Sequence, residues 1–164
     1  MSKIVAMLTG VPYTAPPSLH IQRTDLEFSW FIKSIRHWNG KSSKLVAVKG
    51  IRVLLVRRRL DGRWMFPGGR KRQNESEKDC LKREIKEELP KLKLGRLRLW
   101  KEVKTKNRRS GRKMSDAIFI ANHAFGSLLI GDKKEIDRAI WRKPRGVRLT
   151  PTSRYIRDKL FPKD

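Results

Sequence analysis

The chain has 164 residues, of which 41 are Lys or Arg and 16 are Asp or Glu, and its formal net charge is +25 at pH 7. This length suits one domain with an appendage, burying about two thirds of its unfolded surface. Lys49 and Arg52 interrupt the longest apolar candidate, and no secretory hydrophobic segment occurs, so we expect a cytoplasmic protein without a membrane partner. The single cysteine, Cys80, excludes an intrachain disulfide and disfavours a structural zinc site.

Residues 1–43 are interpreted as an N-terminal extension. Residues 1–24 contain no acidic residue, which leaves a transit peptide as an alternative. Thr24 and Glu27 form a capping box before an apolar stripe, so we predict an amphipathic helix over residues 24–38. The stripe consists of Phe28, Phe31, Ile32, Ile35 and Trp38. We expect this helix to dock on the domain, with a homodimer contact as the alternative, and residues 40–43 (GKSS) to form a short linker.

A strand, a turn and a second strand are predicted next. Residues 51–56 form a mostly apolar run that is typical of a buried strand. The Asp61-Gly62 pair predicts a tight turn, after which residues 64–66 return as the paired strand. Pro67 ends that strand, and the two glycines that follow allow a tight backbone turn before a helix.

Three carboxylates lie on one face of that helix. Glu84, Glu87 and Glu88 are spaced i, i+3 and i+4, so they fall within about one turn of each other and repel one another. A hard divalent cation, Mg²⁺ or Mn²⁺, relieves this repulsion through oxygen ligands. A solvated acidic face is the alternative. Six of the 16 acids lie within residues 75–88 of an otherwise basic chain, which favours the metal site.

The remaining elements complete a layered domain. Leu81, Ile85 and Leu89 recur at i, i+4 and i+8 and predict the core-facing stripe of the helix. Residues 97–106 and 114–121 are expected to pair as antiparallel strands around the basic loop 107–113. Thr150 as N-cap and Pro151 at the first position open a C-terminal helix to about Leu160. Strands that flank a central helix indicate an α/β fold.

The segment from Gly69 to Leu89 combines these features at defined spacings. Glu75 follows Gly69 after five positions, and Arg83-Glu84 and Glu87-Glu88 follow on the helix. This pattern resembles the Nudix box, the signature of hydrolases that cleave the diphosphate linkage of a nucleoside diphosphate joined to another group. The match covers about 23 residues, with looser similarity over residues 44–164. Pro90 and Lys91 depart from it, because the box has Gly and an aliphatic residue there.

The resemblance implies a Nudix domain over residues 44–164. Its expected fold is an α/β/α sandwich with a mixed sheet, and its catalytic loop-helix-loop spans residues 68–92. The departure at Pro90 and Lys91 concerns how the helix ends and leaves the carboxylate face unchanged, with Leu92 expected to supply the apolar contact one position late.

The same resemblance implies roles for individual residues. The Gly68 carbonyl and Glu84, Glu87 and Glu88 would bind Mg²⁺ or Mn²⁺, and Glu84 alternatively activates water as a base. Glu75 and Arg83, with Gly69, would fix the loop against the helix; a surface ion pair of little energetic consequence is the alternative. The candidate catalytic residues are therefore Glu84, Glu87 and, with less support than its clamp role, Arg83. For a fourth metal-binding acid Glu135 is the candidate, with Glu102 and Asp116 as competitors.

Three functions are compatible with this sequence. The first is a divalent-metal-dependent pyrophosphohydrolase of a nucleoside diphosphate derivative or another phosphorylated small molecule. The second directs the same chemistry at the 5′ end of RNA, which the positive charge would hold. The third is a non-catalytic nucleic-acid-binding protein with a Nudix-like fold, which the intact carboxylates disfavour. Arg108, Arg109 and Arg112 are candidate substrate-binding residues in the basic loop.

Overall fold

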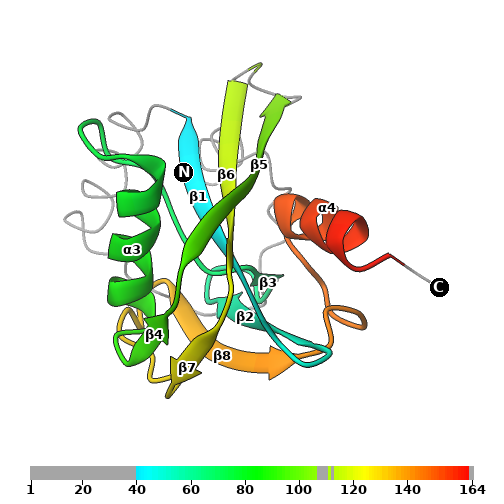
Figure 1. Cartoon of the computed structure of the whole chain (residues 1–164). Coiled ribbons are helices and arrows are strands. Elements are labelled where there is room, and N and C mark those ends of the chain that lie inside the picture. The colour runs from blue at the N-terminus through cyan, green and yellow to red at the C-terminus, as the bar shows by residue number, and fades with distance from the viewer. Residues whose placement is uncertain (1–39, 107–110, 112, 163–164) are drawn as a thin grey trace, which may run out of the picture.

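A computed structural model of the chain describes residues 40–106, 111 and 113–162 (Figure 1). The predicted helix at 24–38 and the candidate residues Arg108, Arg109 and Arg112 lie outside this part. Among the helices within it, none is long and apolar enough to cross a membrane.

A mixed six-stranded sheet forms the centre of the domain. Five strands follow the order β3-β2-β1-β6-β5, and β8 also pairs with β2. β1 and β6 run parallel, whereas the other pairs are antiparallel. These strands are β1 (Lys41–Lys49), β2 (Arg52–Arg58), β3 (Trp64–Met65), β5 (Leu97–Lys106), β6 (Lys113–Ala121) and β8 (Ile136–Arg142). Two short strands, β4 (Leu92–Leu94) and β7 (Ala124–Gly126), form a separate antiparallel ribbon. The predicted pairing of residues 97–106 with 114–121 is thus confirmed as β5 and β6.

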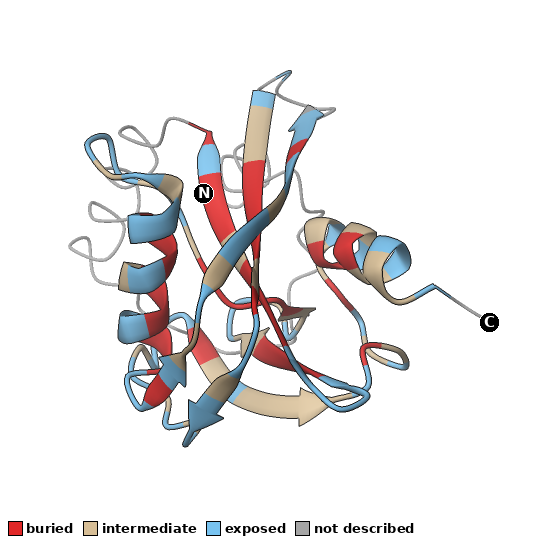
Figure 2. Cartoon of the chain, in the orientation of Figure 1, coloured by how far each residue is buried: buried red, intermediate tan, exposed pale blue. Residues whose placement is uncertain are grey.

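Two helices cover opposite faces of the sheet and make an α/β/α sandwich (Figure 1). α3 (Glu77–Glu88) packs on one side with Leu45, and α4 (Pro151–Leu160) packs on the other with Val46. These neighbours in β1 belong to different core clusters because successive side chains of a strand point to opposite faces. The predicted stripe of Leu81, Ile85 and Leu89 is buried, and it lies on the side of α3 that faces the sheet (Figure 2).

The interpretation of residues 40–43 as a linker is wrong. β1 begins at Lys41, and its parallel pairing with β6 extends from Lys41–Ser115 to Ala47–Ala121. Ser42 and Ser43 are buried, and both hydroxyls have partners: Ser43 donates to the Glu77 carbonyl at 2.7 Å, and Ser42 donates to Asp116. Serine and glycine are typical of linkers, so the sequence suggested one here. The burial of these serines depends on partners that are distant in the sequence, and no local pattern shows them.

The free edge of β1 positions the loop that precedes α3. β1 pairs with β2 only near its C-terminal end, at Val48 and Lys49. Its first half instead forms hydrogen bonds with the loop. The Ser43 N–H donates to the Gly69 carbonyl at 3.0 Å, and the Leu45 N–H donates to the Pro67 carbonyl at 2.8 Å. The loop is therefore held like an additional strand segment.

Both ends of the helices are defined locally. α3 begins after Ser76, whose hydroxyl accepts the Asp79 N–H at 3.1 Å, and it ends as the Leu89 N–H donates to the Ile85 carbonyl. The chain then turns at Pro90, and Leu92 is buried in the core at the start of β4, as expected for the shifted apolar contact. α4 begins at Pro151 after Thr150 and ends at Leu160, which confirms the prediction for this helix.

Candidate active site

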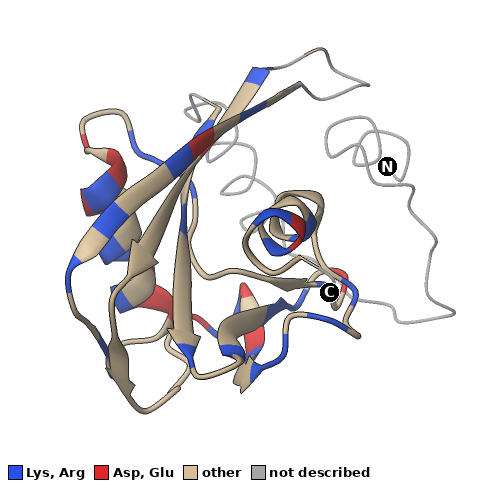
Figure 3. Ribbon diagram, turned by 45° about the vertical axis from the view of Figure 1, so that its right-hand side comes forward, with Lys and Arg blue, Asp and Glu red and all other residues tan. Residues whose placement is uncertain are grey.

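The three carboxylates of α3 lie on one side of the helix, but their exposure differs. Glu84 and Glu88 are buried, with exposed fractions of 9% and 2%, whereas Glu87 is exposed. Acidic residues are few elsewhere in the described structure, whereas Lys or Arg occur on every element except β3 and β7 (Figure 3). Two buried carboxylates on neighbouring turns are costly without a compensating positive charge.

Glu88 contacts the loop directly. Its Oε2 accepts the Gly68 N–H at 3.0 Å, and burial raises the pKa of this carboxyl to about 8 even though Lys44 and the Gly68 N–H act in the opposite direction. Burial also raises the pKa of Glu84, while the Arg83 guanidinium opposes that shift. Both groups therefore lie in a site that disfavours their ionised form unless a cation is present.

Lys44 places a positive charge at this site. Its Nζ donates to the Gly68 carbonyl at 3.0 Å, from the central strand β1. The Gly68 carbonyl is the backbone oxygen that the family resemblance implied as a metal ligand. Lys44 was missed at the sequence level, because one lysine before an apolar run gives no signal in a chain with 41 Lys and Arg.

Arg83 connects the loop to the helix. Its Nε and Nη2 donate to the two Glu75 oxygens at 3.1 and 2.7 Å, and Nη2 also donates to the Arg70 carbonyl at 2.9 Å. Its Nη1 donates to Glu84 at 2.7 Å and to Glu87 at 3.2 Å. The Arg83 hydrogen bonds lower the pKa of Glu75 to about 2. The ion pair expected between Glu75 and Arg83 is present and bidentate, a geometry stronger than that of an ordinary surface pair.

The two glycines allow the loop and helix to approach closely. Gly68 has φ +125°, and a Cβ there would lie 2.1 Å from the Ser43 carbonyl oxygen. A Cβ on Gly69 would lie 2.3 Å from the Glu84 carboxyl group. Any side chain at either position would push the loop away from β1 or displace Glu84.

Glu135 is the fourth acid that the fold brings near the α3 carboxylates. It precedes β8, and its charge helps to raise the pKa values of both Glu84 and Glu88. Desolvation and then Asp132 raise the pKa of Glu135 itself, although the residue as a whole is exposed. Its two competitors are engaged elsewhere: Asp116 accepts hydrogen bonds from Ser42 and Thr152, and Glu102 accepts one from Ser115.

A model of the NUDIX domain family matches residues 44–163. The chain belongs to the NUDIX family. Membership of this family supports a hydrolase that acts on phosphoric anhydride bonds. A comparison with curated proteins found no match.

Two solved structures illustrate the shared fold. A MutT NUDIX hydrolase from Burkholderia pseudomallei is 22% identical with a TM-score of 0.66, and the match covers 73% of this chain and 96% of that one. The E. coli dihydroneopterin triphosphate pyrophosphohydrolase is 18% identical with a TM-score of 0.59, and the match covers 76% and 96%. At these identities the likeness establishes a common fold.

NUDIX hydrolases generally use divalent metal ions, and the donors around α3 fit such an ion. They are carboxylate and carbonyl oxygens, the ligands that Mg²⁺ and Mn²⁺ prefer. The Gly68 carbonyl already accepts a hydrogen bond from a cation, the Lys44 ammonium. Within the described residues no three acidic, histidine or cysteine groups converge with metal-binding geometry. Arg83 holds one oxygen each of Glu84 and Glu87, so a metal ion would bind through the other oxygen of each carboxylate or after the side chains reorient.

Proposed function

We propose that this NUDIX protein is a Mg²⁺- or Mn²⁺-dependent pyrophosphohydrolase that cleaves the diphosphate linkage of a nucleoside diphosphate derivative. The observation that carries the proposal is the burial of Glu84 and Glu88 beside a Gly68 carbonyl that already accepts a hydrogen bond from an ammonium group. A buried acidic pair is unfavourable as a purely structural feature. It is useful in a site that must bind a divalent cation and then a polyphosphate.

Each residue has a distinct role in this mechanism. Glu84, Glu87 and Glu88, with the Gly68 carbonyl and Glu135, would hold the metal, which when bound supplies positive charge to the phosphoryl oxygens and lowers the pKa of water. Glu84 could alternatively serve as the general base, because burial raises its pKa above the ordinary value of a carboxyl. It would take the proton of the water that attacks phosphorus as the P–O bond to the leaving phosphate breaks.

Two basic residues support the reaction without exchanging protons. Arg83 orients Glu84 and Glu87 through Nη1 and fixes the loop through Glu75, which makes it a positioning residue. The Lys44 ammonium, displaced from the Gly68 carbonyl when a metal binds, would remain near enough to offset charge on a diphosphate oxygen.

The decisive experiment is a hydrolysis assay over a substrate panel with Mg²⁺ or Mn²⁺. The panel contains nucleotide sugars, ADP-ribose, dinucleoside polyphosphates and nucleoside triphosphates, and the measurement is the release of phosphate, pyrophosphate or nucleoside monophosphate. The proposal is supported if cleavage depends on the metal and if the highest kcat/KM in the panel belongs to a nucleoside diphosphate derivative. Absence of cleavage across the panel with either metal contradicts it.

The second candidate substrate is the 5′ polyphosphate end of RNA. The net charge of +25 favours it, since a small nucleotide needs only two or three cations near its phosphates. Triphosphorylated RNA should then show a much steeper salt dependence of kcat/KM than ADP-ribose does. Neutralising Arg108, Arg109 and Arg112 together should flatten that dependence, whereas equal slopes for both substrates would favour the small nucleotide.

A further inference from the structure

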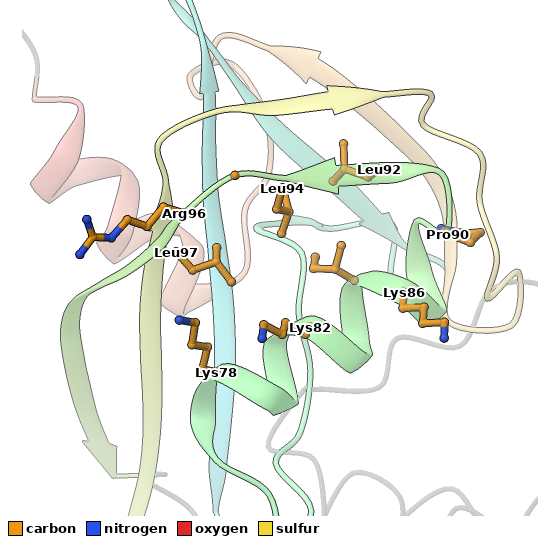
Figure 4. Close-up of a pocket in the computed structure, with 10 residues that line it drawn as sticks. Lys78, Lys82, Lys86, Pro90, Leu92, Leu94, Arg96 and Leu97 are labelled. Carbon is orange, nitrogen blue, oxygen red and sulfur yellow. The ribbon is translucent and has the colours of Figure 1, made fainter.

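α3 carries a second charged surface on the side turned away from the carboxylates. Lys78, Lys82 and Lys86 are spaced i, i+4 and i+8 and are all exposed. Figure 4 shows them on successive turns of the helix, with Leu92 and Leu94 across from them. Together with Arg96 they line a groove of about 380 Å³.

The positive charges around this groove are not neutralised within the described structure. None of the cations Lys78, Lys82, Lys86, Lys93 and Arg96 forms an ion pair with a described residue. The lysines of α3 also repel one another at their i, i+4 spacing. A surface that keeps such repulsion is complementary to a polyanion.

Next to the groove, the β4–β7 ribbon exposes an aromatic pair. The rings of His123 and Phe125 stack with centroids 6.1 Å apart and an interplanar angle of 25°. Both residues are exposed, and Phe125 is 55% accessible. Phe125 lies directly opposite Lys93 in the register, so the ring and the ammonium share the outer face of the ribbon.

The aromatic pair and the groove are adjacent. Gly95 lines the groove, and a Cβ on this glycine would lie 2.4 Å from the His123 ring. The ring therefore lies against the backbone at the edge of the groove. Leu92 and Leu94 line the groove, so Lys93 and its partner Phe125 lie on the other face of the ribbon. The cations of the groove and the aromatic pair therefore meet at the Gly95–His123 edge, and we call these residues together the ribbon surface (Lys78, Lys82, Lys86, Lys93, Arg96, His123 and Phe125).

We propose that the ribbon surface binds single-stranded nucleic acid. Exposed aromatic rings stack on unpaired bases, while flanking Lys and Arg contact the phosphates, and neither contact requires a particular sequence. An acidic peptide would use the same cations but would gain nothing specific from two stacked rings. Because the carboxylates lie on the opposite side of α3, this binding does not depend on the proposed hydrolysis.

The test is fluorescence anisotropy with 12-nucleotide oligouridylate and oligothymidylate that carry a 5′-hydroxyl, in EDTA, so that neither substrate group nor metal contributes. We expect Phe125→Ser to weaken binding about ten-fold without changing the salt slope. The triple variant Lys78→Gln, Lys82→Gln, Lys86→Gln should reduce the slope of log K against log salt by about 2, since each phosphate contact on a single strand contributes roughly 0.7.

Matched controls keep the test specific. The triple variant Lys49→Gln, Arg52→Gln, Lys143→Gln removes the same charge near the β1–β2 turn, and Leu60→Ser removes an exposed apolar side chain elsewhere. Both should leave binding nearly unchanged, and circular dichroism verifies folding of every variant. The proposal is overturned if the two triple variants lose affinity equally, if Phe125→Ser binds normally, or if a 12-residue polyglutamate binds as tightly as the oligonucleotides. Turnover of a small nucleotide should be the same in all of these variants.

Discussion

The two sides of α3 carry charge in opposite ways. On the loop side, Glu84 and Glu88 are buried, and Arg83 connects Glu75, Glu84 and Glu87. On the outer side, three lysines are exposed and have no acidic partner among the described residues. A single helix thus has one side whose charges are ordered by neighbouring groups and another whose charges face solvent. Substitutions on the ordered side should therefore change stability, metal affinity and turnover together, while those on the outer side should not.

The largest effect is expected from the carboxylates of α3. Glu88→Gln or Glu87→Gln should lower kcat by about two orders of magnitude or more, because each removes an anionic oxygen ligand from the metal site. The measurement is turnover at saturating Mg²⁺ on the best substrate. Unchanged turnover in both variants would exclude these residues from the site, and Glu77→Gln, which changes an acid at the start of the same helix, is the control.

The next largest effect is expected from loss of the Arg83 ion pairs. Arg83→Ala leaves Glu75, Glu84 and Glu87 without their shared partner, so we expect a loss of about 2 kcal/mol or more in unfolding free energy. This corresponds to a decrease in Tm of roughly 4–8 °C for a chain of this length. Metal affinity should fall in parallel. If activity disappears while Tm and metal affinity are retained, Arg83 contacts the substrate instead.

Lys44 should affect metal binding more than folding. Lys44→Met removes a positive charge that repels the metal and a donor that occupies the Gly68 carbonyl, so the Kd for Mn²⁺ should decrease by about three- to ten-fold, or roughly 1 kcal/mol. The KM for substrate should rise if the ammonium also contacts a phosphate. Mn²⁺ titration followed by electron paramagnetic resonance measures the Kd directly, and Lys44→Arg should retain both properties. A Kd that is unchanged in Lys44→Met would place Lys44 outside the site.

The pKa of Glu88 predicts how stability without metal depends on pH. The pKa is raised from 4.5 to about 8, so the folded protein binds more protons than the unfolded chain between these values. The contribution of Glu88 to stability therefore falls as pH rises from about 4.5 to about 8, and it is constant outside this window. Thermal melts in EDTA should show this decline in the wild type and a flatter profile in Glu88→Gln. Added Mg²⁺ should raise Tm more at pH 8.5 than at pH 6, because it binds the ionised carboxylate.

The smallest effect is expected on the outer side of α3. The triple substitution of Lys78, Lys82 and Lys86 by Gln should leave small-nucleotide turnover unchanged. It should change unfolding free energy by no more than about 0.5 kcal/mol, since only solvated like charges are relieved. A large loss of stability in this variant would mean that the lysines are engaged in the fold, and the contrast between the two sides would disappear.

The sequence by itself determined the features that depend on neighbours along the chain. The spacing of Glu84, Glu87 and Glu88 and the opposing stripe of Leu81, Ile85 and Leu89 follow from 3.6 residues per turn, so both faces of α3 were predictable. The start of α4 at Pro151 was equally local, because an N-cap and a proline at the first position act within a single turn.

Only the tertiary structure decided the contacts between distant segments. The register of β1 beside the loop places Lys44 at the Gly68 carbonyl and includes Ser42 and Ser43 in the sheet. The ribbon of β4 and β7 places Phe125 opposite Lys93, although no local pattern links them. Helical periodicity is a property of a short segment, whereas strand register depends on which distant partners bury the same side chains, and a single sequence leaves that choice open.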